Sequence, residues 1–410
     1  MNAQTNGSAK TYYVPYMCDH AFALGAVLES FGLQVEVLPP SDDETLSLGL
    51  ESVLGKECSP CFTTTGDFIR RARQPGFDPA KAVAFMPTAD GPCRFGQYYV
   101  LQRQILDDHG LHEVEIVSMA TADNYQGIVD NPTAFRALAW DALVLTDLAQ
   151  KLLHAHRPYE VHPGQADALY GECLQRIVAD TRVGGGRRFD GTASWMARQF
   201  EALRVDRGEP RPIIGLVGEI YLRFNEYGNQ DMIRTVEAAG GEVVLASMME
   251  WLYYIAWGSV RKAFQRGDAW DGLKSKLTEL YQQVREHRLA RHFAHLLPHP
   301  LETPTARLMD NIRPYYEPEL GTEAVLTLGE AIELAHHGAS GILNIMPFSC
   351  MPGIITAGLA PHIRADLDNI PWLDVTFDAR GGTNFQTRLE AFLHQATQYR
   401  RRKKSYPSSH

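Results

Sequence analysis

Cysteines are the residues of this sequence whose spacing most directly suggests chemistry. The chain has six of them, and Cys58 and Cys61 stand close together in GKECSPC, where we expect both to precede a helix over FTTTGDFIRRAR. Two thiols at a helix start are typical of a redox pair, because the helix amide groups lower the thiol pKa. A zinc ribbon would need a second close pair, which neither Cys93 nor Cys350 provides. The spacing leaves a thiol pair, an iron–sulfur site or ordinary buried cysteines as interpretations.

Three of the cysteines lie in segments rich in glycine and proline. Pro60 follows Cys58 at one remove, Gly-Pro precedes Cys93, and Met-Pro-Gly follows Cys350. Iron–sulfur clusters accept ligands from distant parts of a chain, provided that each local loop lets a thiolate point out of a turn. The glycine and proline residues beside Cys58, Cys93 and Cys350 therefore favour an iron–sulfur site over the interpretation that these cysteines are ordinary buried residues.

The other cysteines are interpreted as structural. Cys173 lies among apolar residues of a helical pattern in ALYGECLQRIV, which predicts a core position. Cys18 lies in PYMCDHAFA, at a junction between a strand pattern and a helix pattern, and we favour a structural role for it.

Strand and helix patterns alternate in both halves of the chain. TYYVPYM and LQVEVLPPS enclose a helical pattern that ends at Gly32, and PIIGLVGEIY, QDMIRTVEAAGG and EVVLAS repeat this order. The sequence therefore looks internally duplicated. Two further strand patterns, each followed by Met-Pro and a short loop, place Cys93 and Cys350 beyond the carboxyl ends of strands. Since ligands bind at this edge of open α/β sheets, we expect both cysteines in one cleft between two lobes.

The predicted fold is α/β, with two parallel-sheet lobes joined by helical segments. A chain of 410 residues is long enough for two such units. We expect a first lobe at 11–132 and a second lobe at 209–395. Helical periodicity predicts a connector at 133–208 and an insertion at about 248–297. The basic segment 396–410 predicts a disordered tail.

Composition excludes several classes of function. A net charge of -10 argues against a general nucleic-acid surface, which needs concentrated positive charge. The sequence has no run of about 18 apolar residues, and its first ten residues lack the apolar core of a signal peptide. We therefore predict a cytoplasmic protein without a membrane partner, whose cysteines do not form structural disulfides.

Four segments together resemble a known family: GKECSPC, FMPTADGPCRFGQYYVLQR, GLVGEIYLRFNEYGN and NIMPFSCMPG. They are similar to the activase-related proteins of the 2-hydroxyacyl-CoA dehydratase and benzoyl-CoA reductase superfamily, in the portion that follows the ATPase domains of long activase-related chains. The likeness runs in the same order from about residue 11 to residue 395. It implies Rossmann-like lobes and a 4Fe-4S cluster held by three cysteines, with one iron open. By position, the implied ligands are Cys58, Cys93 and Cys350.

The resemblance also implies a function and partners. The cluster would accept a low-potential electron from an ATP-dependent activase on another chain, either to activate an acyl-CoA substrate reductively, as a dehydratase or reductase component, or to relay the electron. Ligation by Cys61 would close the cluster and favour relay. Six cysteines would suffice for a double-cubane cluster, but the helical position of Cys173 argues against it. The superfamily's paired subunits imply a homodimer or a heterodimer with a related chain.

Several polar residues have expected roles beside the cysteines. Arg94, directly after Cys93, could offset thiolate charge or pair with an acid. Glu219, Arg223 and Asn225 crowd a strand's carboxyl end, where they could form a buried salt bridge, support the cluster or contact an anion.

Two other functions remain open from the sequence. One is a non-catalytic scaffold that binds a partner of an activase system. The other is a thiol-disulfide protein that uses Cys58 and Cys61, in which Cys61 would be essential and Cys350 would not.

Overall fold

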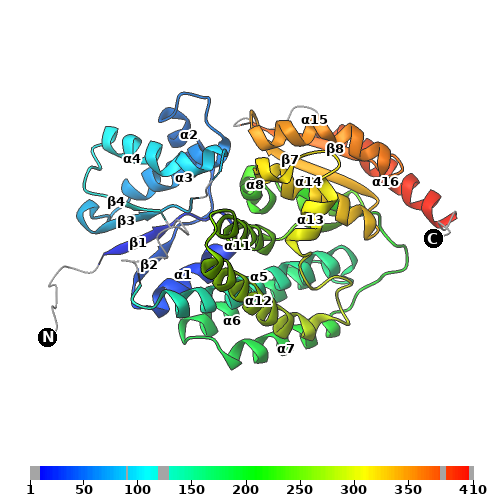
Figure 1. The fold of residues 1–410 in the computed structure, drawn as a ribbon, viewed down its shortest axis with the longest axis horizontal. Helices are drawn as coiled ribbons and strands as arrows, with labels where there is room; N and C mark the ends of the chain where they lie inside the picture. Colours follow the sequence, from blue (N-terminus) through cyan, green and yellow to red (C-terminus); the bar gives the residue numbers. More distant parts are fainter. Residues whose placement is uncertain (1–9, 89–90, 119–128, 379–384, 406–410) are drawn as a thin grey trace.

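The computed structural model describes residues 10–88, 91–118, 129–378 and 385–405. It confirms an α/β fold with two four-stranded, all-parallel sheets flanked by helices (Figure 1). The strands of the first sheet, in the spatial order β2-β1-β3-β4, are β1 (Thr11–Val14), β2 (Gln34–Val37), β3 (Ala82–Phe85) and β4 (Glu115–Val117).

The second sheet repeats the strand order of the first. Its strands, in the order β6-β5-β7-β8, are β5 (Ile213–Gly218), β6 (Glu242–Leu245), β7 (Gly341–Pro347) and β8 (Trp372–Phe377). Thus β3 and β7 are equivalent strands. Each pairs with the first strand of its sheet, β1 or β5, on either side of which the chain adds strands in opposite directions. The internal duplication expected from the sequence is present in the topology.

The helices of the first lobe flank its sheet (Figure 1). They are α1 (His20–Ser30), α2 (Asp43–Glu51), α3 (Ser59–Ala72), η1 (Pro79–Lys81), η2 (Arg94–Gln97) and α4 (Tyr98–Asp108). Helices α2 and α3 pack with almost no side chain between them. A methyl group at Gly49 would lie 2.0 Å from the Phe62 carbonyl oxygen, and one at Gly66 would lie 2.0 Å from that of Thr45. Glycine at both positions is what allows this contact.

The helices around the second sheet range from single turns to the 21 residues of the last one. They are α8 (Ile220–Phe224), α9 (Glu226–Asn229), α10 (Met232–Ala238), α13 (Thr305–Ile312), η6 (Pro318–Leu320), α14 (Glu323–His336), α15 (Met351–Asp366) and α16 (Phe385–Ser405). Because α16 continues to Ser405, residues 396–405 are helical rather than the disordered tail predicted from their charge. Ala396 and Tyr399 are buried, and this packing carries the helix into its basic end.

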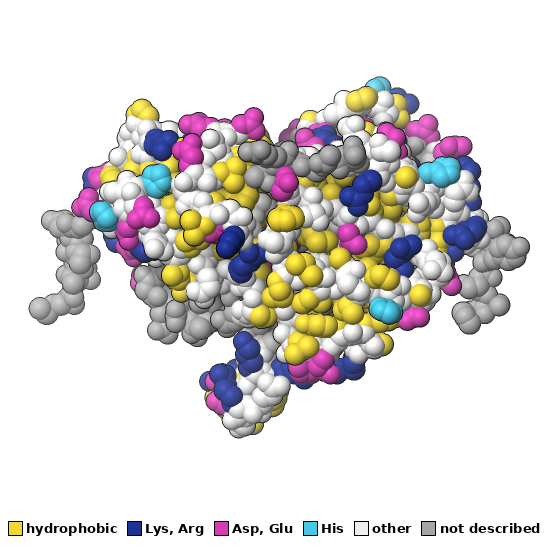
Figure 2. All heavy atoms as spheres, turned by 90° about the horizontal axis from the view of Figure 1, so that it is seen from above, with side chains coloured by type: hydrophobic (Ala, Val, Ile, Leu, Met, Phe, Trp, Pro, Cys, Tyr) yellow, Lys and Arg dark blue, Asp and Glu magenta, His cyan; other side chains and the backbone are white. Residues whose placement is uncertain are grey.

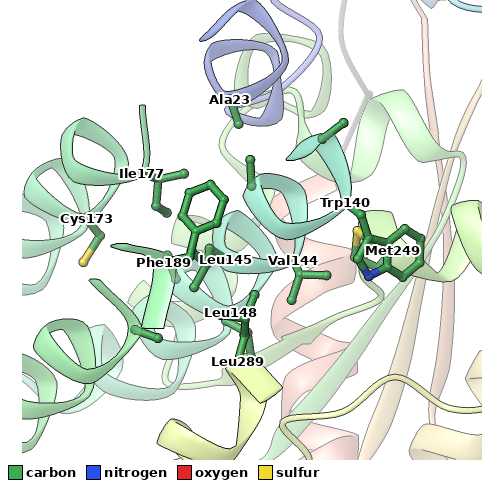
Figure 3. Close-up of a cluster of buried hydrophobic side chains, with 14 of the residues drawn as sticks. Ala23, Trp140, Val144, Leu145, Leu148, Cys173, Ile177, Phe189, Met249 and Leu289 are labelled. Atoms are coloured by element: carbon green, nitrogen blue, oxygen red, sulfur yellow. The ribbon is translucent and has the colours of Figure 1, made fainter. Parts of the chain in front are cut away.

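A third group of helices lies between and below the lobes in Figure 1. It comprises α5 (Pro132–His156), η4 (Arg157–Tyr159), α6 (Gln165–Arg182), α7 (Arg187–Ala202), α11 (Met248–Gln265), α12 (Ala269–Ala290) and η5 (Arg291–Phe293). Their buried faces form one hydrophobic core with α1. Figure 3 shows Leu145 of α5, Ile177 of α6, Phe189 of α7 and Leu289 of α12 in this core.

Buried polar contacts join this core to the first lobe. Asp147 of α5 lies 3.0 Å from His20 Nε2 of α1 and accepts hydrogen bonds from the N–H groups of Met248 and Met249 at the start of α11. One carboxylate thereby fixes three helices that are distant in the sequence, and it satisfies two helix-start donors that have no partner within their helix. Among the described helices, none is long and apolar enough to cross a membrane.

Candidate functional site

Three cysteines occupy equivalent backbone positions at helix starts. Cys58 is the N-cap of α3, Cys93 precedes η2 and α4, and Cys350 is the N-cap of α15. Their φ and ψ angles are -70° and 147°, -69° and 138°, and -65° and 120°, respectively. In α3 and α15, of 14 and 16 residues, the free amide groups of the first turn favour negative charge on the capping sulfur.

The sheet topology brings these cysteines to the same kind of place in each lobe. Cys93 follows β3 and Cys350 follows β7, so both lie beyond the carboxyl ends of equivalent strands, beside the point at which strand order reverses. Open α/β sheets bind ligands there. Cys58 reaches the same region from the start of α3.

Arg94 connects the three cysteine segments directly. Its Nη1 donates to the Lys56 carbonyl oxygen over 2.7 Å, and its Nη2 donates to the Ser349 carbonyl oxygen over 2.6 Å. Lys56 lies two residues before Cys58, Ser349 lies one residue before Cys350, and Arg94 follows Cys93. The guanidinium group therefore ties both lobes together at the site. Among the described residues its partners are these two carbonyl oxygens and no acid.

The thiols are close enough to influence one another electrostatically. Burial raises the pKa of Cys58, and it raises the pKa of Cys93 to about 12. It also raises the pKa of Cys350, and negative charge on Cys58 adds to the increase at Cys93 and at Cys350. Burial and mutual repulsion therefore disfavour ionisation of these thiols unless a nearby positive charge offsets both effects.

A polar group near each sulfur opposes the burial-induced rise in thiol pKa. These groups are the Tyr98 hydroxyl near Cys58, the Phe95 N–H near Cys93 and the Gly353 N–H near Cys350. Donors of this kind stabilise thiolates and raise the reduction potential of iron–sulfur clusters.

Cys61 lies inside helix α3 rather than before it, which corrects the sequence-based expectation. Its N–H donates to the Cys58 carbonyl oxygen over 2.9 Å, and its side chain packs with Met86 and Tyr98. Burial, followed by the charge of Cys58, raises the pKa of Cys61 to about 12. The raised pKa values of Cys58 and Cys61 disfavour the thiolate form of both residues in the metal-free protein.

Two partly buried acids lie near the cysteines. Burial raises the pKa of Glu219, and it raises the pKa of Glu323 to about 8, with a further contribution from Glu219. Both carboxylates raise the thiol pKa of Cys58, Cys93 and Cys350, which places both of them near the three thiols. Glu219 caps α8 by accepting the N–H groups of Tyr221 and Leu222 over 3.1 and 3.0 Å.

The remaining predicted polar residues have structural partners. Arg223 Nη1 lies 3.3 Å from Glu250 Oε2, and both side chains are buried, which matches the salt-bridge interpretation with Glu250 as the partner. Asn225 donates to the Tyr16 carbonyl oxygen over 3.2 Å and thereby links the second lobe to the loop after β1.

Within the part of the chain that the structure describes, no group of three or more His, Cys, Asp or Glu side chains is arranged to hold a metal ion. Of the other cysteines, Cys173 is fully buried in the helical core of Figure 3, and Cys18 is buried at the start of α1.

Comparison with known proteins gives no assignment: no model of a protein family matches this chain, and no curated protein matches it in sequence.

Tyr98 and Glu323 are site residues that sequence reasoning missed. Tyr98 lies five positions after Cys93 at a helix start, and a helical reading of this segment could have placed it near the cysteines. Glu323 is the first residue of α14 and follows the N-cap Thr322, whose φ is 74°. The sequence gives no signal that this helix start lies near the cysteines.

Proposed function

We propose that this chain is a 4Fe-4S protein whose cluster is bound by Cys58, Cys93 and Cys350. The observation that carries the proposal is the convergence of three cysteine helix starts from two lobes, held together by the two hydrogen bonds of Arg94. Each of the three thiols has a polar group nearby that favours its ionised form, which supports a role as a thiolate ligand. Cys61, packed beneath Cys58, supports the ligand from the helix interior.

When bound, such a cluster accepts and passes on a low-potential electron. The chain's own residues would tune and protect this step. Tyr98 and the two backbone donors stabilise sulfur charge, whereas Glu219 and Glu323 oppose added negative charge when they are ionised. Burial of Cys58 and Cys350 excludes water from their sulfurs.

The proposed physiological role is that of a component of the 2-hydroxyacyl-CoA dehydratase type in the cytoplasm. Its electron donor would be an ATP-dependent activase on another chain. The electron would serve reductive activation of an acyl-CoA ligand or relay to a related subunit. This role extends the cluster proposal through the family resemblance of the cysteine segments.

Iron and acid-labile sulfide measured per chain, after anaerobic reconstitution, test the proposal. We expect about four irons per chain, lost in Cys93→Ser and retained in Cys173→Ser. About eight irons per chain would instead indicate the double-cubane type. Iron no higher than background in the wild-type protein would contradict the cluster, and a colourless protein that captures an activase would indicate a scaffold.

A further inference from the structure

Helix α12 carries a line of large apolar side chains that face solvent. Their exposed fractions lie between 48% and 65%, and the residues are Trp270, Leu273, Leu277, Leu280 and Val284. Contiguous exposed apolar surface is uncommon in monomers and marks sites of association. We call these five residues the α12 stripe.

The α12 stripe has the spacing of a coiled-coil seam. Its members follow one another at intervals of three, four, three and four residues, which is the a/d pattern of two heptads. The C-terminal end of the helix is anchored, since Leu289 and Ala290 are buried and Arg285 and Arg288 pair with Asp141. The stripe is thus presented on a helix whose position is fixed.

Neighbouring side chains widen this surface. Phe264 at the end of α11 and Tyr281 of α12 are each at least half exposed. Figure 2 shows a segment that projects from the body of the molecule, on the side where α11 and α12 lie in Figure 1. The exposed fractions of the stripe residues show that the lobes do not cover them.

We infer that the α12 stripe is the interface of a homodimer, in which α12 of a second copy packs antiparallel against it. The charged residues of this part of α12 are already paired within the helix, because Lys274 Nζ lies 3.4 Å from Asp271 and Lys276 Nζ lies 2.8 Å from Glu279. These two pairs have no net charge. They therefore favour an identical surface over a strongly acidic or basic partner.

The available area is sufficient for such a dimer. The five stripe residues with Phe264 and Tyr281, each about half exposed, offer on the order of 600 Å² per copy, given about 150–250 Å² for a large apolar side chain. Two copies would bury on the order of 1,200 Å² in total, the lower end of stable interfaces.

A two-fold axis near Leu277 would make this interface self-complementary. It would set Leu277 against its own counterpart and Trp270 against the partner subunit's Val284, so that a large side chain meets a smaller one. In Figure 1, α12 lies in the lower half of the molecule, whereas α3 and α15, which Cys58 and Cys350 begin, lie in the upper half. The dimer leaves the cysteine site open and does not depend on the proposed cluster.

Sedimentation equilibrium of the full chain between about 1 and about 100 μM tests this interface. We expect the wild-type protein to dimerise, Leu277→Glu to weaken dimerisation at least about tenfold, and Leu320→Glu, at an exposed leucine of η6, to leave it unchanged. A wild-type protein that stays monomeric up to about 100 μM would overturn the inference, including a monomer that binds lipid vesicles instead.

Disulfide formation tests the antiparallel arrangement. Leu277→Cys should cross-link two copies under mild oxidation, whereas Val284→Cys should not, because the two residues at position 284 lie at opposite ends of the interface. Wild-type protein controls for the native cysteines, of which five are buried and Cys93 is partly buried. Cross-linking by both variants indicates parallel helices and overturns the arrangement, as does cross-linking by neither in a dimeric protein.

Discussion

Arg94 donates a 2.6 Å hydrogen bond to the carbonyl oxygen of Ser349, a residue 255 positions away in the chain. Ser349 has a φ of 57°, a left-handed conformation that is uncommon for serine. The second amino group of the same guanidinium holds the Lys56 carbonyl oxygen. The cysteine site is therefore assembled across the two lobes by the protein itself, through side-chain contacts to backbone.

Removal of the Arg94 guanidinium should loosen this assembly. In Arg94→Ala, two charge-assisted hydrogen bonds are lost, each worth about 1.5–3 kcal/mol, so we expect Cys350 in the metal-free protein to react with a thiol reagent at least about tenfold faster. Arg94→Lys should show an intermediate rate, because lysine keeps the positive charge but lacks the planar guanidinium group that reaches both carbonyl oxygens. Arg182→Ala, which removes an exposed pair with Glu29, is the matched control and should be unchanged. Equal rates in Arg94→Ala and wild type would contradict the role.

The close contact of α2 and α3 predicts an asymmetric response to alanine. Gly66→Ala would place a methyl group 2.0 Å from the Thr45 carbonyl oxygen, and we expect it to lower the free energy of unfolding by about 1–3 kcal/mol. Gly171→Ala lies mid-helix in α6 with open space around it, and should raise the free energy of unfolding by about 0.5–1 kcal/mol. Denaturant unfolding of both variants checks this, and a neutral Gly66→Ala would show that the helices can separate without cost.

Asp67 predicts a pH dependence of stability. Burial raises its pKa from 3.8 to about 7, although Ser41 and Thr45 donate to it over 3.1 Å. Because the folded-state pKa is raised, the folded protein binds this proton more tightly than the unfolded chain. The resulting stability is fully present below about pH 4 and is lost as the pH rises through about 7.

Asp67→Asn should remove this dependence. The difference in unfolding free energy between Asp67→Asn and wild type should therefore grow in favour of the variant from pH 4 to pH 7, by on the order of 2 kcal/mol. Asp310→Asn, at an exposed carboxylate, is the control and should show no such trend. A constant difference for Asp67→Asn across this range would mean that Asp67 is ionised at low pH in the folded protein.

The Tyr98 hydroxyl should set the acidity of Cys58. Loss of the hydroxyl in Tyr98→Phe should raise the Cys58 pKa further, because this group lowers the thiol pKa against the effect of burial. The measurement is the pH dependence of Cys58 alkylation in metal-free protein, followed by mass spectrometry. Tyr99→Phe, at the adjacent tyrosine, should leave the profile unchanged. An unshifted profile in Tyr98→Phe would mean that burial alone determines the Cys58 pKa.

The fold could be predicted from the sequence because its patterns are local. Alternating strand and helix patterns, repeated in both halves, predicted two parallel sheets, and Met-Pro segments before Cys93 and Cys350 indicated equivalent strand ends. The contacts within the site were less accessible. Arg94 could be placed beside Cys93, but its partners at Lys56 and Ser349 depend on how two lobes meet.

The structure differs from the sequence-based expectation in two further places, the basic end of the chain and the position of Cys61. Neither the charge of the first nor the cysteine spacing of the second indicates the packing found there. The basic end of the chain is helical because Ala396 and Tyr399 pack on the second lobe, and Tyr399 also donates to the Leu367 carbonyl oxygen over 3.0 Å. Cys61 lies in the first turn of α3 because Cys58, with its extended backbone, is the N-cap, and Pro60 suits an early helical position. In both segments, packing decides where the helix begins or ends.

The most direct test of the central proposal is the iron content of two variants from opposite lobes, Cys58→Ser and Cys350→Ser, after identical anaerobic reconstitution. A single cluster shared between the lobes predicts that each substitution alone removes most of the iron and acid-labile sulfide, with Cys18→Ser retaining both. Retention of wild-type iron in either variant would contradict a cluster bound jointly by Cys58, Cys93 and Cys350.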